Sequence, residues 1–135
     1  DDYTKPEQAV DFVKRTGVER LAVAFGNIHG IVTKQKEELD IGHLMKIVAA
    51  APDPYYVLHG ASGLSDAQVK AAIAAGISCV HFNTELRVAY QHALKDELIA
   101  EPHQTTPYKL FAGAAAAVRE LVQDKTRMFM NGANA

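Results

Sequence analysis

The sequence lacks the features that mark several specialised classes of protein. Its single cysteine, Cys79, excludes a disulfide framework and a cysteine-based zinc site. No run of about 18 apolar residues occurs, so we expect no transmembrane helix and no membrane partner. Residues 1–5 provide no apolar signal core. Together these absences predict a cytoplasmic protein.

An excess of positive charge is also missing. The chain has 14 Lys and Arg against 16 Asp and Glu, which gives a net charge of −2 with the histidines neutral. A nucleic-acid groove needs a basic stripe, so no nucleic-acid partner is expected. Hydrophobic residues make up 48% of the chain and charged residues 22%, which is typical of a globular protein. The 135 residues fit one domain, and we expect a single region over residues 1–135.

Short apolar runs alternate with amphipathic segments along the chain. The runs at residues 21–25, 55–58 and 77–82 are typical of strands that are covered on both faces. Capping residues and helical periodicity predict the helices between them. These helices are expected from a Thr4–Glu7 capping box to Gly17, from Asp40 to Ala50, from a Ser65–Gln68 capping box to Ala75, from Asn83 to Leu98 and from about Tyr108 to Lys125, with residues 126–135 as a frayed tail.

This order predicts an α/β fold of parallel βαβ units with right-handed crossovers. Three strands are too few to close a barrel, and a complete (β/α)8 barrel needs about 250 residues. We therefore expect the chain to be the C-terminal part of a TIM barrel, with about three parallel strands and flanking helices.

Histidines follow two of the predicted strands in matching His-Gly pairs. His29 and His59 fall at or just after strand ends, and His81 lies near the end of the third strand. Active sites of parallel barrels gather at the C-terminal ends of strands, and imidazole is a common zinc ligand. Each histidine alone could simply pack in the barrel mouth, but two matching pairs favour a metal site.

A loop of small residues follows His59. Gly60, Ser62 and the helix that begins at Ser65 can offer backbone N–H groups and a hydroxyl to an anion, and the Asn83–Thr84 turn can do the same. The alternative is that the glycines make tight turns and the hydroxyl residues cap helices, and loop composition leaves both open. The remaining notable side chains are expected to lie at the surface (His43, His92, His103) or to pack (Tyr55, Tyr56, Cys79).

Three segments of the sequence, at residues 26–30, 57–63 and 83–86, resemble class II (zinc-dependent) ketose-bisphosphate aldolases, of which fructose- and tagatose-bisphosphate aldolases are the main members. The segment at residues 3–18 is similar to the helix that precedes the sixth strand of that family. The resemblance extends from Tyr3 to about Lys125. Its three motifs stand in the family's order and spacing, which makes it specific.

The resemblance implies roles for individual residues. It implies zinc at His29 and His59, with a second, monovalent cation also compatible. It places a dihydroxyacetone-phosphate moiety at Gly30, Gly60 and Ser62, with its phosphate at Ser62 and Thr84. Ala61, His81 and Asn83 belong to the same substrate-binding set. The third zinc histidine, the catalytic aspartate and a mobile-loop glutamate are expected upstream of Asp1, so the catalytic residues lie outside these 135 residues.

The implied activity is zinc-dependent aldol cleavage or condensation of a ketose 1,6-bisphosphate, yielding dihydroxyacetone phosphate and glyceraldehyde 3-phosphate, as in glycolysis and related carbohydrate metabolism. The expected partners are a sugar-phosphate substrate, the N-terminal half of the barrel and further copies in a homo-oligomer. Two residues depart from the family, His81 in place of Asn and Ala61 in place of Gly. They favour the alternative of a non-catalytic sugar-phosphate-binding paralog. A further alternative is a half-barrel subunit that needs a partner.

Overall fold

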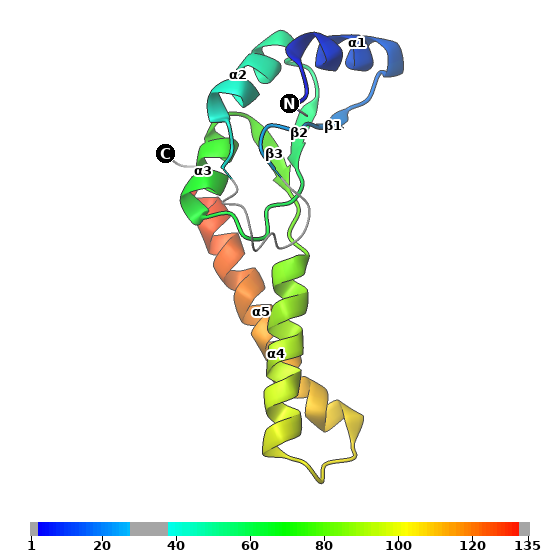
Figure 1. Cartoon of the computed structure of the whole chain (residues 1–135), viewed down its shortest axis with the longest axis vertical. Coiled ribbons are helices and arrows are strands. Elements are labelled where there is room, and N and C mark those ends of the chain that lie inside the picture. The colour runs from blue at the N-terminus through cyan, green and yellow to red at the C-terminus, as the bar shows by residue number, and fades with distance from the viewer. Residues whose placement is uncertain (1–2, 28–37, 133–135) are drawn as a thin grey trace. The chain divides into compact units, whose positions relative to one another are not determined.

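The computed structural model describes residues 3–27 and 38–132, and Figure 1 shows the order of their helices and strands. The described residues up to Phe82 form one compact unit, here called the sheet unit, and residues 83–131 form a second, the hairpin unit. The elements are α1 (Pro6–Thr16), β1 (Arg20–Ala22), α2 (Ile41–Ala50), β2 (Tyr55–Leu58), α3 (Asp66–Ala74), β3 (Ile77–Val80), α4 (Thr84–Ala100) and α5 (Pro107–Gly132).

The three strands form a parallel sheet in the order β1-β2-β3. Ala22 pairs with Val57 at the end of β1, and Leu58 pairs with Val80 at the end of β3. The predicted parallel βαβ arrangement is therefore confirmed. Because the strands are parallel and in sequence order, the residues that follow them emerge at the same edge of the sheet.

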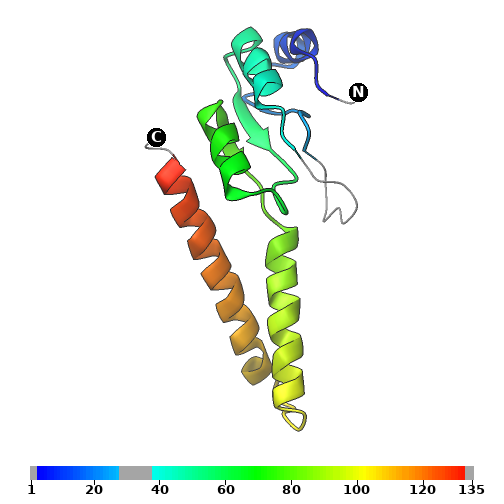
Figure 2. The same ribbon diagram turned by 60° about the vertical axis from the view of Figure 1, so that its left-hand side comes forward.

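The core of the sheet unit surrounds the central strand. Tyr56, Val57 and Leu58 are all buried, as expected for a strand that is covered on both faces. Helices α2 and α3 contact each other, and α3 contacts β3, so the two helices lie side by side along the sheet (Figure 2). The Tyr56 hydroxyl donates to the Ala51 carbonyl oxygen at 2.6 Å. Burial, with a smaller contribution from Asp53, raises the pKa of Tyr56 above its usual value.

Two of the predicted helix starts are confirmed by their capping contacts. The Asp40 carboxylate accepts from the His43 backbone N–H at 2.8 Å at the start of α2. At the start of α3, the Ser65 hydroxyl accepts from the Gln68 backbone N–H at 3.3 Å, and the Gln68 side chain accepts from the Ser65 N–H at 3.3 Å. Both caps are local in sequence, which is why the residue pattern alone predicted them.

The predicted Thr4–Glu7 capping box of the first helix is wrong. The N-cap residue is Lys5, whose backbone N–H donates to Gln8 Oε1 at 3.0 Å. The Thr4 hydroxyl instead accepts from the Ala24 backbone N–H at 2.9 Å, because the segment before α1 pairs with the chain after β1.

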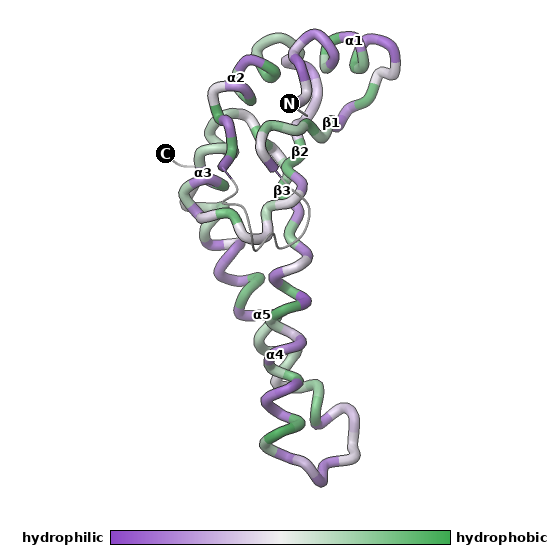
Figure 3. The backbone as a smooth tube through the Cα atoms, in the orientation of Figure 1, coloured by the Kyte–Doolittle hydropathy of each residue, from purple (hydrophilic) through white to green (hydrophobic). Residues whose placement is uncertain are grey.

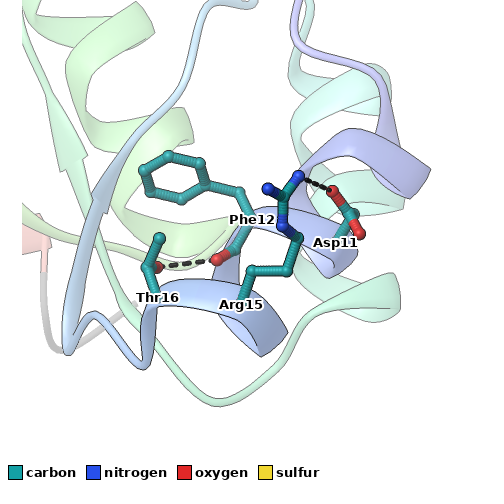
Figure 4. Close-up of polar contacts among 4 residues, drawn as sticks. All are labelled: Asp11, Phe12, Arg15 and Thr16. Atoms are coloured by element: carbon teal, nitrogen blue, oxygen red, sulfur yellow. Dashed lines mark hydrogen bonds and ion pairs between the residues drawn. The ribbon is translucent and has the colours of Figure 1, made fainter.

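Near its C-terminal end, α1 has two side-chain contacts on its exposed face. Figure 4 shows the Thr16 hydroxyl donating to the Phe12 carbonyl oxygen at 2.6 Å and Arg15 next to Asp11 at 3.4 Å. Gly17, with φ of 65°, ends the helix as predicted, since few residues other than glycine adopt this left-handed conformation.

The first strand is shorter than the predicted run of residues 21–25. The backbone of Ala24 accepts from Thr4 N–H, and the backbone of Phe25 accepts from Asp40 N–H, each at 2.8 Å. These residues therefore bond to the segments before α1 and α2.

His43 is expected at the surface, but it is half-buried, and its Nε2 lies 2.8 Å from the Thr4 carbonyl oxygen.

Helices α4 and α5 of the hairpin unit run antiparallel. Glu85 near the start of α4 pairs with Lys125 near the end of α5, with 3.1 Å between Oε2 and Nζ. Helix α5 continues to Gly132, so residues 126–132 of the predicted frayed tail are helical. The Thr126 hydroxyl donates to the Val122 carbonyl oxygen at 2.8 Å within this last part of the helix.

Hydrophilic and hydrophobic residues alternate along both helices of the hairpin unit (Figure 3). Among the described helices, none combines the length and the apolar character needed to cross a bilayer.

Candidate functional site

The sheet unit brings two histidines together at the C-terminal edge of the sheet. His59 directly follows β2, and His81 directly follows β3. The His81 backbone N–H donates to the Leu58 carbonyl oxygen at 3.0 Å, which aligns the two strand ends. The two imidazole rings meet edge to face, with 4.5 Å between centroids and 83° between planes. His59 is half-buried and His81 is exposed.

An amide side chain joins the end of β1 to the same edge. Asn27 Oδ1 accepts from the Phe25 backbone N–H at 3.0 Å, and its Nδ2 donates to the His59 carbonyl oxygen at 3.1 Å. The sequence alone did not single out Asn27. The available signal was its position in the glycine-flanked segment between a buried apolar run and His29.

The loop after His59 is tightly turned and partly buried. Gly60 and Gly63 have φ of 72° and 100°, a region that L side chains rarely adopt. Between them Ala61 is fully buried and Ser62 is 5% exposed. Ser62 is the one buried polar side chain among residues 3–27 and 38–130, which places a hydroxyl inside a loop beside the strand end.

The loop leads directly into α3 through the Ser65 cap. The expectation that Ser65 caps a helix is confirmed, and so is the expectation that the glycines make tight turns. These structural roles are compatible with anion binding, since a helix start and a turned glycine backbone both offer N–H groups to an anion. The arrangement can therefore present an imidazole and an anion-binding loop on consecutive residues.

Four further residues belong to the predicted site. His29 and Gly30 lie outside the described residues. Asn83 and Thr84 begin α4 in the hairpin unit, where Asn83 is the N-cap residue and its carbonyl oxygen accepts from the Arg87 N–H at 3.1 Å. The residues that the structure brings together are His59, Gly60, Ala61, Ser62 and His81.

The donor set at this edge suits a nitrogen-preferring metal such as zinc, because imidazole is one of its usual ligands. In the part of the chain that the structure describes, no group of three His, Cys, Asp or Glu side chains could hold a metal ion. Of the two histidines predicted as metal ligands, His59 is the one that the structure describes.

Comparisons with known proteins give one family. The family model described as fructose-bisphosphate aldolase class-II matches residues 1–134. YdjI of Escherichia coli strain K12, an uncharacterised protein, is 40% identical over 128 residues, which cover 94% of this chain and 43% of YdjI.

Solved structures show the same fold. The crystal structure of the YdjI aldolase from E. coli K12 superposes with a TM-score of 0.82 at 38% identity, over 94% of this chain and 46% of that one. Fructose-bisphosphate aldolase from Campylobacter jejuni gives a TM-score of 0.79 at 16% identity, over 94% of this chain and 45% of that one. The chain thus spans less than half the length of these relatives, and the predicted α/β part of a TIM barrel is confirmed.

Proposed function

This chain belongs to the class II fructose-bisphosphate aldolase family, and on that premise we propose that the complete protein is a zinc-dependent aldolase for a ketose 1,6-bisphosphate. Fructose and tagatose bisphosphates are the candidate substrates, with dihydroxyacetone phosphate and glyceraldehyde 3-phosphate as products. The observation that carries the proposal is His59, which stands at the C-terminal end of the central strand and leads directly into the buried Ser62 loop.

In this proposal His59 and His29 hold the metal ion, and a third ligand comes from the part of the barrel outside this chain. The chemistry that a bound zinc ion supplies in such a site is Lewis-acid polarisation of a carbonyl oxygen. A second, monovalent cation is compatible with it. The contribution of His59 is a half-buried imidazole whose backbone is fixed at a strand end.

The substrate-binding set in the proposal has two parts. Gly30, Gly60, Ala61 and Ser62 form the first, in which the turned backbone at Gly60 binds the dihydroxyacetone-phosphate moiety and the Ser62 hydroxyl, together with Thr84, binds its phosphate. His81, Asn83 and Thr84 form the second. A phosphate held in this way fixes the position of the reacting carbons relative to the metal ligand, which lowers the entropic part of the barrier.

The zinc proposal is tested on the complete protein with His59→Ala and a matched control, His92→Ala. His92 is also a histidine but is exposed on α4. We expect His59→Ala to lose bound zinc and to lower kcat/KM at least ~100-fold, because even the partners of metal ligands contribute 10- to 100-fold. Zinc content is measured by mass spectrometry, and cleavage of both bisphosphates is measured by a coupled assay.

The control His92→Ala should match the wild type in both measurements. Chelation should abolish cleavage by the wild-type protein, and added zinc should restore it. Full activity of the chelated protein would contradict the metal mechanism.

One observation favours the alternative of a non-catalytic sugar-phosphate-binding protein. His81 stands where the resemblance implies a substrate-binding Asn, and its ring lies against His59. The coupled assay separates the two functions, since the alternative predicts zinc and sugar-phosphate binding with no cleavage of either bisphosphate. Any cleavage that responds to zinc would exclude it. Substrate binding is measured by calorimetry with dihydroxyacetone phosphate.

The remaining partners follow from the same proposal. The N-terminal half of the barrel completes the site, and the protein assembles as a homo-oligomer. Sedimentation of the complete protein measures the assembly state.

A further inference from the structure

The end of β2, at Leu58 and His59, is held from both neighbouring strands. From the β3 side, the His81 N–H donates to the Leu58 carbonyl oxygen at 3.0 Å, one residue before His59. From the β1 side, the Asn27 side chain donates to the carbonyl oxygen of His59 itself at 3.1 Å. The strand end is therefore fixed by one backbone contact and one side-chain contact.

The side-chain contact lies beyond the end of the β1–β2 pairing. The register of these strands runs from Arg20 opposite Tyr55 to Ala22 opposite Val57. Asn27 and His59 lie past this last pair, and the Asn27 amide takes the place of a further backbone hydrogen bond between the two segments. The same amide is anchored on its own segment, because its Oδ1 accepts from the Phe25 N–H at 3.0 Å.

Only a side chain with both a donor and an acceptor can make this pair of contacts. A backbone N–H can only donate and a carbonyl oxygen can only accept, so the partners Phe25 and His59 fix which way the Asn27 amide faces. An aspartate would keep the acceptor but would set an oxygen against the His59 carbonyl oxygen. Alanine would remove both contacts.

We propose that Asn27 is a positioning residue, which acts through the His59 backbone to orient the His59 imidazole against His81 and toward its metal. The last step rests on the proposed function, whereas the orientation of the ring does not. Loss of a group that orients a metal ligand typically lowers metal affinity 10- to 100-fold. The same loss is expected for Asn27→Ala and for the nearly isosteric Asn27→Asp.

The test compares these two variants of the complete protein with a control, Asp40→Ala. The control also removes a side-chain contact to a backbone N–H, that of His43 at 2.8 Å, but this contact does not involve His59. Zinc affinity is measured by competition with a chromophoric chelator, and the His59 and His81 ring resonances are measured by NMR. Unfolding midpoints are measured alongside.

We expect both Asn27 variants to weaken zinc binding ~10- to 100-fold and to shift the ring resonances of His59 and His81. The control should lower the unfolding midpoint but leave zinc affinity and these resonances as in the wild type. Asn27 variants that lose stability only, with unchanged affinity and resonances, would overturn the proposal. If the wild type binds no zinc, the metal function fails, and the ring resonances alone then decide the role of Asn27.

Discussion

The sheet unit and the hairpin unit differ in how many of their apolar side chains are buried. Of the 17 buried apolar residues among those described, 15 belong to the sheet unit. Of the 11 large apolar side chains that are exposed, seven belong to the hairpin unit, including Leu98, Ile99 and Tyr108. The sheet unit is therefore organised around a core of its own, whereas much of the apolar surface of the hairpin unit stays accessible in this chain.

This difference concerns how firmly individual residues are held in each unit. In the sheet unit, buried neighbours and hydrogen bonds across the strand ends fix His59 and Ser62 in one arrangement. In the hairpin unit, the Lys125–Glu85 ion pair joins the two antiparallel helices, and Ala114 and Met128 are the buried apolar residues among those described. Three pairs of substitutions, each with one residue from either unit, test this comparison.

The largest contrast is expected between Leu58→Ala and Leu98→Ala. Leu58 is fully buried in β2, and its truncation should lower the free energy of unfolding by ~2–5 kcal/mol through lost burial and the cavity left behind. Leu98 is 48% exposed, so its truncation should change stability by less than about 0.5 kcal/mol. Guanidinium unfolding of the complete protein measures both. Equal losses would mean that the Leu98 face is buried in the complete protein, and the comparison would fail.

A contrast of opposite sign is expected between Gly26→Ala and Gly113→Ala. Gly26 has φ of 110°, and a Cβ there would press against the Glu38 backbone carbonyl, so the substitution should destabilise by about 1–3 kcal/mol. Gly113 lies in α5, where a Cβ would meet Glu97 Oε2 at 3.4 Å. Alanine in that helix should stabilise by roughly 0.5–1 kcal/mol.

Thermal unfolding of the two glycine variants gives the sign of each change. Stabilisation by Gly26→Ala would show that the backbone before the His29 segment tolerates another conformation. Destabilisation by Gly113→Ala would show that α4 and α5 approach too closely for a methyl group.

The smallest contrast is expected in the pH dependence of Tyr56→Phe and Tyr108→Phe. Burial raises the folded-state pKa of Tyr56, so its neutral, hydrogen-bonded hydroxyl stabilises the fold fully below the unfolded pKa of about 10. As pH rises above 10 toward the folded pKa, the unfolded chain ionises first and this stabilisation is lost. Tyr56→Phe should therefore cost about 1 kcal/mol at pH 8, and the cost should shrink above pH 10.

Tyr108 is 75% exposed, and Tyr108→Phe should behave like the wild type at every pH. Urea unfolding at pH 8 and at several values above pH 10 measures both variants. A cost for Tyr56→Phe that stays constant with pH would contradict the role of burial at Tyr56.

Features that depend on neighbouring residues in the chain were predictable from the sequence. The Asp40 and Ser65 caps follow from side chains that reach backbone groups three residues away, and Gly17 follows from its backbone freedom. The Thr4 cap was predicted wrongly because its hydroxyl bonds to Ala24, 20 residues along the chain, and no local pattern encodes that partner. The same non-local pairing shortened the first strand.

The alternation of strands and helices, the position of His59 after a buried strand and the turned glycines that follow it are all predictable from the sequence. These are set by local periodicity, capping and backbone conformation, which act over a few residues. The contact of the His81 ring with His59 and the hydrogen bond from the Asn27 amide to the His59 carbonyl oxygen are visible only in the folded chain. Those contacts join residues 22 and 32 positions apart, and they exist because the parallel pairing of β1, β2 and β3 brings three strand ends to one edge.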